Sequence, residues 1–469
     1  MTTALWDFSD LVAASGGVSD GMPSRDVTGF TIDSRALQPG EVFVALTDRR
    51  DGHEFVSTAF AAGASAAIVK KGYVRQSGDG ALIRVEDPQT ALEKIGVASR
   101  ARLNPKAKVV AVTGSVGKTG TKEMLRACLG QLGTVHASEK SFNNHFGVPL
   151  TLARMPKTVD FAVFEIGMNH AEEIRPLAKM VLPHAAIITT VEAVHLENFA
   201  TVDDIADAKA EIFDGVVPGG TVVIKRDNPF CGRLKDSAAR LGLKVSTFGF
   251  AADADVVFHE LIAREDGSHL TVQMHGRRSE IILGIPGVHI AENALGVVAT
   301  LDALGVDVAK GVKALSSLKP PSGRGARSYL TVPGGTALLI DESYNANPAS
   351  MRAALKTLAA VSRENFPRRI AVLADMLELG PDADAMHLAL QDAVDDAGVD
   401  LIFACGPRMK GLYDALDDRK KGHYAPKARD LEDRIAAHLR LGDVVMVKGS
   451  NGLRLQPLVA ALQTRFPPA

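Results

Sequence analysis

The sequence has few cysteines, few aromatic residues and almost no excess of charge. Its three cysteines, Cys128, Cys231 and Cys405, are spread over 469 residues. That spacing does not suit a disulfide framework or a zinc knuckle, and we expect buried free thiols. The 53 basic residues nearly balance the 55 acidic ones. Nucleic-acid coats and membrane-surface proteins need a basic excess, so both classes are disfavoured.

Long apolar runs are also missing. No stretch of roughly 18 apolar residues occurs, so no membrane-spanning helix is expected. The N-terminal residues MTTALWDFSDLVAASGG lack a basic leader before an apolar stretch, and no signal peptide is expected. With 46% hydrophobic and 23% charged residues, the chain can form globular domains with cores of their own. We therefore expect a cytoplasmic protein without membrane or nucleic-acid partners.

Strand-like and helical patterns alternate over two long stretches of the chain. Between residue 109 and about residue 318 the strand-like runs are VVAVT, DFAVFEI, AAIITTV and TVVIK. After the connector LKPPSGRGARSY they resume as TALLIDE, RIAVLADM, LIFACG and VVMVKG. Short continuous apolar runs are typical of strands buried on both faces of a parallel sheet. The alternation therefore predicts two open α/β sheets.

A further unit precedes these two stretches. Its strand-like runs include FTIDSR, GEVFVAL, AAIVKK and ALIRV. It ends in a charged, proline-containing connector at residues 101–108. The sequence thus predicts three α/β domains, at residues 1–107, 108–322 and 323–469.

The stretch VVAVTGSVGKTGTKEM contains Gly117, Lys118 and Thr119, the end of a phosphate-binding loop. The usual consensus, G-x-x-x-x-G-K-[ST], has a glycine where this chain has Val112. The tripeptide alone also occurs by chance. Its context is more specific, because an apolar strand ends at Thr113 and a helical pattern begins at Lys118.

A strand–loop–helix unit points backbone N–H groups and the positive end of a helix at one spot. Lys118 would then reach the β- and γ-phosphates of a nucleotide, and the Thr119 hydroxyl would bind Mg²⁺. The alternative is a plain turn with a solvated lysine, which the flanking strand and helix disfavour. The predicted nucleotide-binding residues of the loop are Thr113, Gly114, Ser115, Val116, Gly117, Lys118 and Thr119.

Two polar residues follow the next predicted strands. Glu165 ends DFAVFEI and His195 follows AAIITTV, so both are expected at the edge of the sheet where open α/β sheets bind ligands. Single strand-end residues of these types are often structural. Together, beside a phosphate loop, they indicate metal ligands, and Glu165 suits Mg²⁺. Lys209, in DIADAKAEIFDGV, would by itself be an exposed helix lysine.

These motifs resemble the Mur ligase superfamily, the ATP-dependent amide-forming enzymes of peptidoglycan precursor synthesis. In that family the loop reads T-G-[ST]-x-G-K-T, which residues 113–119 match, so Val112 is an expected departure from the longer consensus. The AK-x-EIF pattern is similar to the family segment whose lysine is carbamylated by CO₂. The resemblance implies metal ligands at Thr119, Glu165, His195 and carbamylated Lys209, and catalytic roles for Lys118, Lys209, His195 and Arg324.

Other matches extend over most of the chain. SFNNHFGVPLTL implies substrate contacts at Asn143 and Asn144. In GVHIAENALGVVAT, Asn293 matches the position that approaches adenine, although Ile290 stands where the family usually has asparagine. SGRGARSY implies an interdomain arginine near the γ-phosphate, Arg324.

The segment DESYNANP resembles the branch of the family that adds D-alanyl-D-alanine rather than a single amino acid. On composition alone it is also an Asn-rich turn. The match implies a nucleotide ribose contact at Asp341 and substrate contacts at Asn345 and Asn347. TIDSRALQPGEVFVAL is similar to the UDP-sugar-binding module of the same branch, with Ser34 and Arg35 as the diphosphate contacts.

The fold implied is α/β in three domains: an N-terminal UDP-binding module, a central P-loop-type ATPase domain with a mostly parallel sheet, and a C-terminal Rossmann-like doubly wound domain. The activity implied is ligation of D-alanyl-D-alanine to UDP-N-acetylmuramoyl-tripeptide, with ATP and Mg²⁺, by a monomer that takes only small-molecule substrates. Three alternatives stay open: the Mur ligase that adds the third amino acid, a folylpolyglutamate synthase-like ligase, and a non-enzymatic nucleotide switch.

Overall fold

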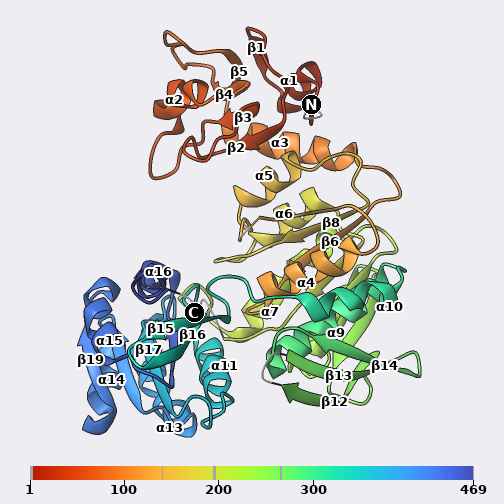
Figure 1. Cartoon of the computed structure of the whole chain (residues 1–469). Coiled ribbons are helices and arrows are strands. Elements are labelled where there is room, and N and C mark those ends of the chain that lie inside the picture. Colours follow the sequence, from red (N-terminus) through yellow and green to blue (C-terminus); the bar gives the residue numbers. More distant parts are fainter. Residues whose placement is uncertain (1–3, 140, 194–196, 265–266, 468–469) are drawn as a thin grey trace.

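The computed structural model describes residues 4–139, 141–193, 197–264 and 267–467. Within these ranges the strands form three sheets, of five, nine and six strands, which follow one another along the chain (Figure 1). Most strand pairs are parallel, and helices separate many of the consecutive strands. The predicted three-domain α/β fold is therefore confirmed, while the stated domain limits stay a prediction. No helix in the described ranges has the length and apolar character needed to cross a bilayer.

The first unit is a five-stranded sheet in the order β1-β5-β4-β3-β2. Its strands are β1 (Val18–Asp20), β2 (Gly29–Thr31), β3 (Glu41–Val44), β4 (Ala66–Lys70) and β5 (Ala81–Val85). Its helices are α1 (Phe8–Ser15), α2 (Val56–Ala61) and α3 (Pro88–Ala101). Asp87 caps α3 through the backbone N–H of Thr90, and Pro88 occupies the first turn, where no N–H is needed.

The middle unit is the largest, with the strand order β14-β13-β12-β11-β10-β9-β6-β8-β7. Its strands are β6 (Lys108–Thr113), β7 (Val135–Ala137), β8 (Phe161–Glu165), β9 (Ala185–Ile188), β10 (Thr221–Lys225), β11 (Lys244–Gly249), β12 (Val256–Arg264), β13 (Gly267–Met274) and β14 (Arg277–Leu283). Its helices are α4 (Lys118–Gly130), α5 (Gly147–Ala153), α6 (Ile174–Val181), α7 (Val202–Ala210), α8 (Cys231–Arg240), α9 (Val288–Ala303) and α10 (Val308–Gly311). The last three strands are an antiparallel extension that the sequence analysis did not anticipate.

Strand β6 of this sheet pairs in parallel with β8 on one side and β9 on the other. The chain runs from β6 outward to β7 and β8 and then returns across β6 to β9. This reversal is a topological switch point, and open α/β sheets bind ligands beyond the carboxyl ends of their strands at such points. The loop after β6 therefore lies where a ligand is expected.

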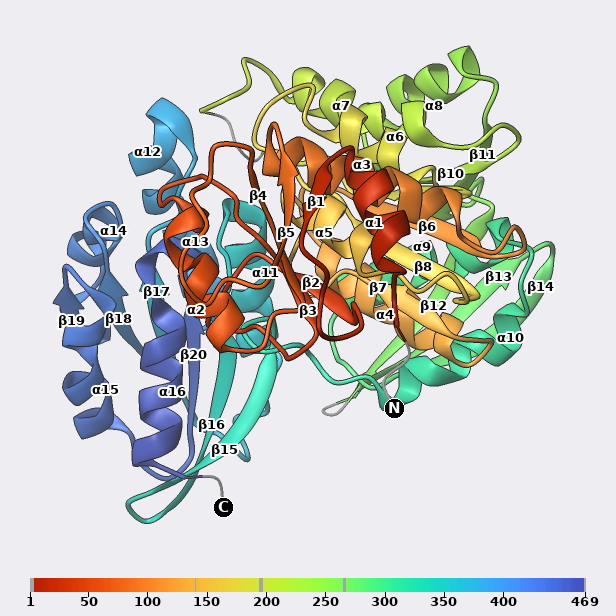
Figure 2. The ribbon, with the colours of Figure 1, turned by 90° about the horizontal axis from the view of Figure 1, so that it is seen from above.

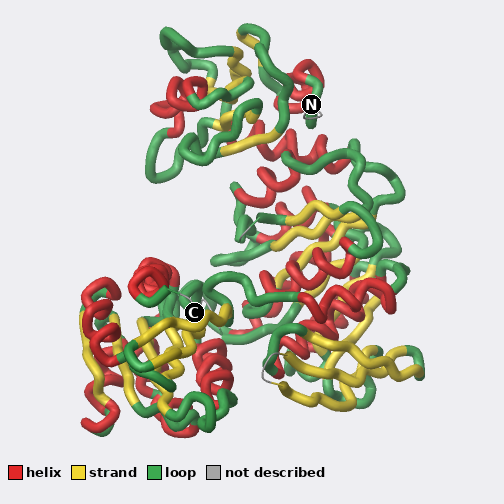
Figure 3. Tube along the Cα trace, viewed as in Figure 1, coloured by secondary structure: helices red, strands yellow, loops and turns green. Residues whose placement is uncertain are grey.

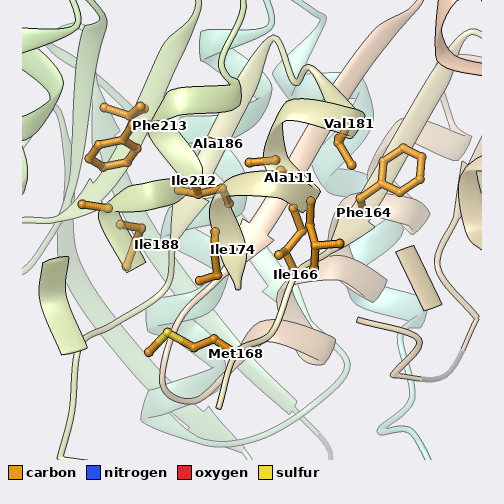
Figure 4. Close-up of a cluster of buried hydrophobic side chains, with 14 of the residues drawn as sticks. Ala111, Phe164, Ile166, Met168, Ile174, Val181, Ala186, Ile188, Ile212 and Phe213 are labelled. Carbon is orange, nitrogen blue, oxygen red and sulfur yellow. The ribbon is translucent and has the colours of Figure 1, made fainter. Parts of the chain in front are cut away.

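Apolar side chains cover both faces of the middle sheet. One face carries the cluster drawn in Figure 4, in which Phe164 and Ile188 of the strands meet Ile174 of α6 and Phe213. The other face packs against α4 and α9 through Leu125 and other buried side chains. Because both faces are buried, the strands read as continuous apolar runs in the sequence.

The third unit has the strand order β15-β16-β20-β17-β18-β19. Its strands are β15 (Ala326–Val332), β16 (Gly335–Glu342), β17 (Arg368–Ala374), β18 (Leu401–Cys405), β19 (Lys421–Ala425) and β20 (Asp443–Lys448). Its helices are α11 (Pro348–Ala359), α12 (Ala383–Leu388), α13 (Gln391–Asp396), α14 (Met409–Ala415), α15 (Glu432–His438) and α16 (Leu455–Arg465). Only β15 runs antiparallel to its neighbour, so the predicted doubly wound sheet is confirmed.

The two junctions between units differ. A shared apolar cluster joins the first sheet to Leu150 and Ala153 of α5. The Trp6 indole N–H also donates to the Ala153 carbonyl at 3.1 Å, and the Arg102 guanidinium stacks on the Trp6 ring. The core clusters of the third unit, by contrast, begin at Leu330 and contain no residue of the middle unit. Seen from above, the third unit lies to one side of the other two, and loop joins it to them (Figures 2 and 3).

Candidate active site

The loop between β6 and α4 has the conformation of a phosphate cradle. Gly114 and Gly117 both have positive φ, 146° and 85°. A side chain at Gly117 would lie 2.7 Å from Asn293 Oδ1, and one at Gly114 would collide with the Thr189 hydroxyl. Both positions thus require glycine, for conformation and for space. Gly117 directly precedes the first turn of α4, so the N-terminal end of that helix faces the loop.

Lys118 and Thr119 begin α4 and face the same site. The Lys118 ammonium group donates to the Gly114 carbonyl at 2.6 Å, so it lies folded over the loop. Burial lowers the pKa of Lys118; Glu165 opposes that shift and Arg324 adds to it. The Thr119 hydroxyl donates to Glu165 Oε2 at 2.9 Å. The loop and the end of β8 therefore meet at one point.

Glu165 is the buried carboxylate of the site, with 1% of its surface exposed. Its second oxygen accepts a hydrogen bond from the Asn143 amide at 2.8 Å. Both donors are neutral, so the negative charge of Glu165 is oriented but not neutralised by them. An oriented carboxylate beside a phosphate loop is suited to a cation.

Lys209 lies on α7 and is buried, with 2% of its surface exposed. Burial holds the pKa of its amine well below the usual lysine value, and Lys118 lowers it further. Among the residues that the structure describes, its amine has no hydrogen-bond or ion-pair partner. Lys209 is therefore not the exposed lysine that its helical pattern alone would indicate. His195, the other predicted metal ligand, lies outside the described residues.

A cavity of about 540 Å³ opens from this loop toward the third unit. Its walls come from the phosphate loop, the segment around Asn143 and Asn144, the start of α9 with Asn293, the connector, and the third unit. It brings together most of the predicted site residues, which are Ser115, Val116, Gly117, Lys118, Thr119, Asn143, Asn144, Glu165, Asn293, Arg324, Asn345 and Asn347. The carboxyl ends of two sheets thus face one space.

The connector and the third unit contribute Arg324 and the Asn-rich segment. The Arg324 guanidinium carbon lies 4.4 Å from the centre of the Tyr344 ring, which holds the charge at the cavity wall. Asn347 caps α11 through the Ser350 N–H at 2.8 Å. Asn345 Oδ1 accepts from its neighbour Ala346, so both asparagines shape the turn and also line the cavity.

Some predicted residues do not line the cavity, among them Asp341, Arg35, Ser34 and Lys209. Asp341 is buried and does not line the cavity; its carboxylate accepts from the Gly323 N–H at 2.8 Å and from Ser343, so it fastens the connector. Arg35 lies in the first unit and pairs with Asp33 at 2.7 Å while remaining exposed. Neither Arg35 nor the neighbouring Ser34 lines the cavity.

The structure also identifies site residues that the sequence analysis missed. The Thr189 hydroxyl, just after β9, donates to the Val116 carbonyl at 2.5 Å and so supports the phosphate loop. Lys225 and Lys448 end β10 and β20 and line the cavity. Their ammonium groups lie 3.0 Å from Glu292 and 3.5 Å from Glu342. The rule that found Glu165, a polar residue ending a parallel strand, would have found these lysines too.

Comparison with known proteins identifies the family. Residues 112–301 match the Mur ligase middle domain, and residues 331–451 match the Mur ligase, glutamate ligase domain. The chain is 33% identical to the UDP-N-acetylmuramoyl-tripeptide–D-alanyl-D-alanine ligase of Escherichia coli, over 94% of this chain and 95% of that protein. The chain belongs to the Mur ligase family, in its MurF branch.

Solved MurF structures agree with this assignment. MurF of Acinetobacter baumannii superposes with a TM-score of 0.85 at 30% identity, covering 99% of this chain and all of the other. MurF of Thermotoga maritima, solved in complex with ADP, has a TM-score of 0.76 at 25% identity and covers 94% of this chain and 99% of the other. The resemblance inferred from the sequence is confirmed, and so is its MurF branch.

Proposed function

We propose that this MurF-branch ligase joins D-alanyl-D-alanine to the terminal carboxylate of UDP-N-acetylmuramoyl-tripeptide in peptidoglycan synthesis, with conversion of ATP to ADP and phosphate. The observation that carries the proposal is the meeting of Lys118, Thr119 and Glu165 at the mouth of a cavity that two units share. The near full-length relatives with this activity, and the ADP complex of one of them, support it.

The reaction begins with two anions that repel each other. The γ-phosphoryl group moves from ATP to the substrate carboxylate, which forms an acyl phosphate and releases ADP. The free amine of the dipeptide then attacks the carbonyl carbon, and the tetrahedral intermediate collapses with loss of a proton and of phosphate. Lys118 and Arg324 supply positive charge where the two anions meet, which lowers the cost of bringing them together.

The residues present fit a Mg²⁺ ion. Within the described ranges no group of three or more His, Cys, Asp or Glu side chains forms a complete metal cage. Mg²⁺ does not need one in a nucleotide site, because phosphate oxygens and water fill most of its coordination positions. Thr119 and Glu165 would hold the ion through oxygen atoms, as would His195 through nitrogen. When bound, the ion neutralises phosphate charge.

Lys209 fits carbamylation by CO₂, which the resemblance implies. Burial without a carboxylate partner lowers the pKa of the Lys209 amine and so favours its neutral form, and only the neutral amine attacks CO₂. The product is an anion with two oxygens that could orient a cation beside Glu165. The same step would replace a poorly solvated amine with a group that binds the site's positive charges.

The remaining assignments complete the proposal. The UDP diphosphate would be bound by Ser34 and Arg35. The peptide substrates would be bound by Asn143, Asn144, Asn345 and Asn347. The nucleotide would be bound by Thr113, Gly114, Ser115, Val116, Asn293 and Asp341. Since Asp341 fastens the connector, a ribose contact would require movement of that segment. We extend the proposal to a cytoplasmic monomer with domains at residues 1–107, 108–322 and 323–469.

Turnover by the Lys118→Ala variant tests the role of Lys118 in phosphoryl transfer. We expect phosphate release to fall about 100- to 1000-fold, because one preorganised cation is lost from the transferring phosphoryl group. Lys179→Ala, an exposed lysine on α6, is the matched control and should retain activity. Offering D-alanyl-D-alanine beside single amino acids and glutamate separates this ligase from the third-residue ligase and the folylpolyglutamate synthase-like enzyme. Phosphate release that depends on none of them would point to a nucleotide switch.

A further inference from the structure

A second buried lysine of α4 is not explained by nucleotide binding. Lys122 is one turn beyond the phosphate loop, and its side chain is fully buried, with 0% exposed. It is not among the residues that line the cavity. Burying an ammonium group costs free energy unless the group is paired and hydrogen-bonded, so the partners of Lys122 are significant.

One contact of Lys122 ties α4 to the segment that follows β7, and another lies within α4. The Lys122 ammonium group donates to the Ser138 carbonyl at 2.7 Å and pairs with Glu123 Oε1 at 2.8 Å. The other oxygen of Glu123 is held by Arg126 at 2.7 Å. Lys122 therefore clamps the helix of the phosphate loop onto the segment that follows β7.

Ser138, which Lys122 holds, is in turn hydrogen-bonded to Glu165. The Ser138 hydroxyl accepts a hydrogen bond from the Glu165 backbone N–H at 3.2 Å, and the Ser138 N–H donates to the Val163 carbonyl at 3.1 Å. Ser138 is thus bonded to β8 through both its side chain and its backbone. Since Lys122 holds the Ser138 carbonyl, the position of Glu165 relative to α4 depends on this lysine.

The same segment also carries Asn143. Asn143 donates to the Glu165 carboxylate, and its carbonyl accepts from the Gly167 N–H at 2.8 Å. The opposite carboxylate oxygen accepts from Thr119, which lies on α4 three residues before Lys122. Both groups that orient Glu165 therefore belong to the two segments that Lys122 joins.

We infer that Lys122 is a positioning residue, which sets the orientation of Glu165 and Thr119 toward the cation of the ATP site. This inference rests on the proposed metal role of Glu165. A buried ion pair adds little net stability compared with an apolar pair of the same volume, so fold stability alone does not account for a charged group here. Removal of a residue that orients a metal ligand typically lowers metal affinity or activity by about 10- to 100-fold.

The test is a Mg²⁺ titration of phosphate release by the full-length Lys122→Met variant. Met keeps the length of the side chain and removes its charge and donors. We expect the Mg²⁺ concentration for half-maximal activity to rise about tenfold and kcat to fall about 10- to 100-fold, with an unchanged KM for D-alanyl-D-alanine. Lys179→Met is the control and should titrate as the wild type does. Equilibrium unfolding is measured in parallel, and Lys122→Gln replaces Lys122→Met if the latter does not fold.

The Glu165→Gln variant distinguishes the metal role of Glu165 from the positioning role of Lys122. If Glu165→Gln shifts the Mg²⁺ titration but Lys122→Met does not, the positioning role is refuted and the metal site stands. If neither variant shifts the titration, the metal role of Glu165 fails, and the inference fails with it. A Lys122→Met variant that loses stability but titrates as the control does would show a purely structural lysine and also overturn the inference.

Discussion

Buried amines define this site at the scale of single residues. Burial lowers the pKa values of Lys118, Lys209 and Lys448, and the first and last of these line the cavity. Concentrated, poorly solvated cations are stabilised by an incoming triphosphate, which supplies the missing negative charge. Lys209 differs from the other two, because Glu165 raises the pKa of Lys118 and Glu342 that of Lys448, whereas no carboxylate of the described residues opposes the shift of Lys209. The reactivity of the Lys209 amine should therefore depend more strongly on pH than that of the other two lysines.

Lys209 should form a carbamate near neutral pH, where an ordinary lysine does not. Because burial lowers the pKa of Lys209 well below the usual value of 10.5, a larger fraction of its amine is neutral at a given pH than for an exposed lysine. As pH falls through the folded-state pKa, the amine gains a proton and the carbamate is lost. Binding of that proton is tighter in the unfolded chain, so stability also declines as pH drops below 10.5. With ¹³C-labelled bicarbonate, a carbamate carbon signal should appear for the wild type and vanish for Lys209→Arg.

Two outcomes of this NMR experiment would contradict the assignment. One is a carbamate signal that persists in Lys209→Arg, which would locate the modification at another amine. The other is a wild type without any signal while ligation proceeds at its full rate, which would show that the modification is not required.

Most strands of the fold could be predicted from the sequence, but several site contacts could not. VVAVT, DFAVFEI and TVVIK are apolar because β6, β8 and β10 are buried on both faces, and such runs are visible in the sequence. The environment of Lys209 was not visible, because an amphipathic helix pattern does not show which polar residue faces a closed interior. The sequence motif predicts a ligand contact for Asp341, but a carboxylate near a connector is equally able to accept hydrogen bonds from backbone N–H groups.

At the scale of elements, the phosphate loop depends on its last glycine. Gly117 has φ of 85°, and an added Cβ would lie 2.7 Å from Asn293 Oδ1. Gly117→Ala should therefore lower the free energy of unfolding by about 1–2 kcal/mol and raise the KM for ATP, because left-handed backbone is strained for alanine and the loop would shift. Chemical denaturation and initial-rate kinetics measure the two effects.

Gly130→Ala is the matched control for this loop variant. Gly130 ends the same helix, has ordinary helical φ and has no heavy atom within 4 Å of an added Cβ. Its replacement should leave stability unchanged or raise it by up to about 1 kcal/mol, with no effect on ATP kinetics. Equal behaviour of the two variants would mean that Gly117 is not constrained as the structure indicates.

At the scale of the whole molecule, the two junctions predict which parts move together. The first and middle units share an apolar cluster, the Trp6–Ala153 hydrogen bond, and a further bond of 2.7 Å from the Arg154 guanidinium to the Phe30 carbonyl. The third unit has its own cores and is linked through a connector fastened by Asp341. The substrates must bridge this second junction, so ligand binding should move the third unit as a body.

Solution scattering with a non-hydrolysable ATP analogue, Mg²⁺ and UDP-N-acetylmuramoyl-tripeptide should show a smaller radius of gyration than the free protein. Trp6 is the single tryptophan of the chain and is buried at the first junction, so its fluorescence should stay constant through the same titration. Arg324→Ala should weaken the compaction, because it removes the connector's charge toward the phosphates while leaving the first junction intact. A change in Trp6 emission without compaction would mean that the rigid and the mobile junctions are the reverse of those inferred from the cores.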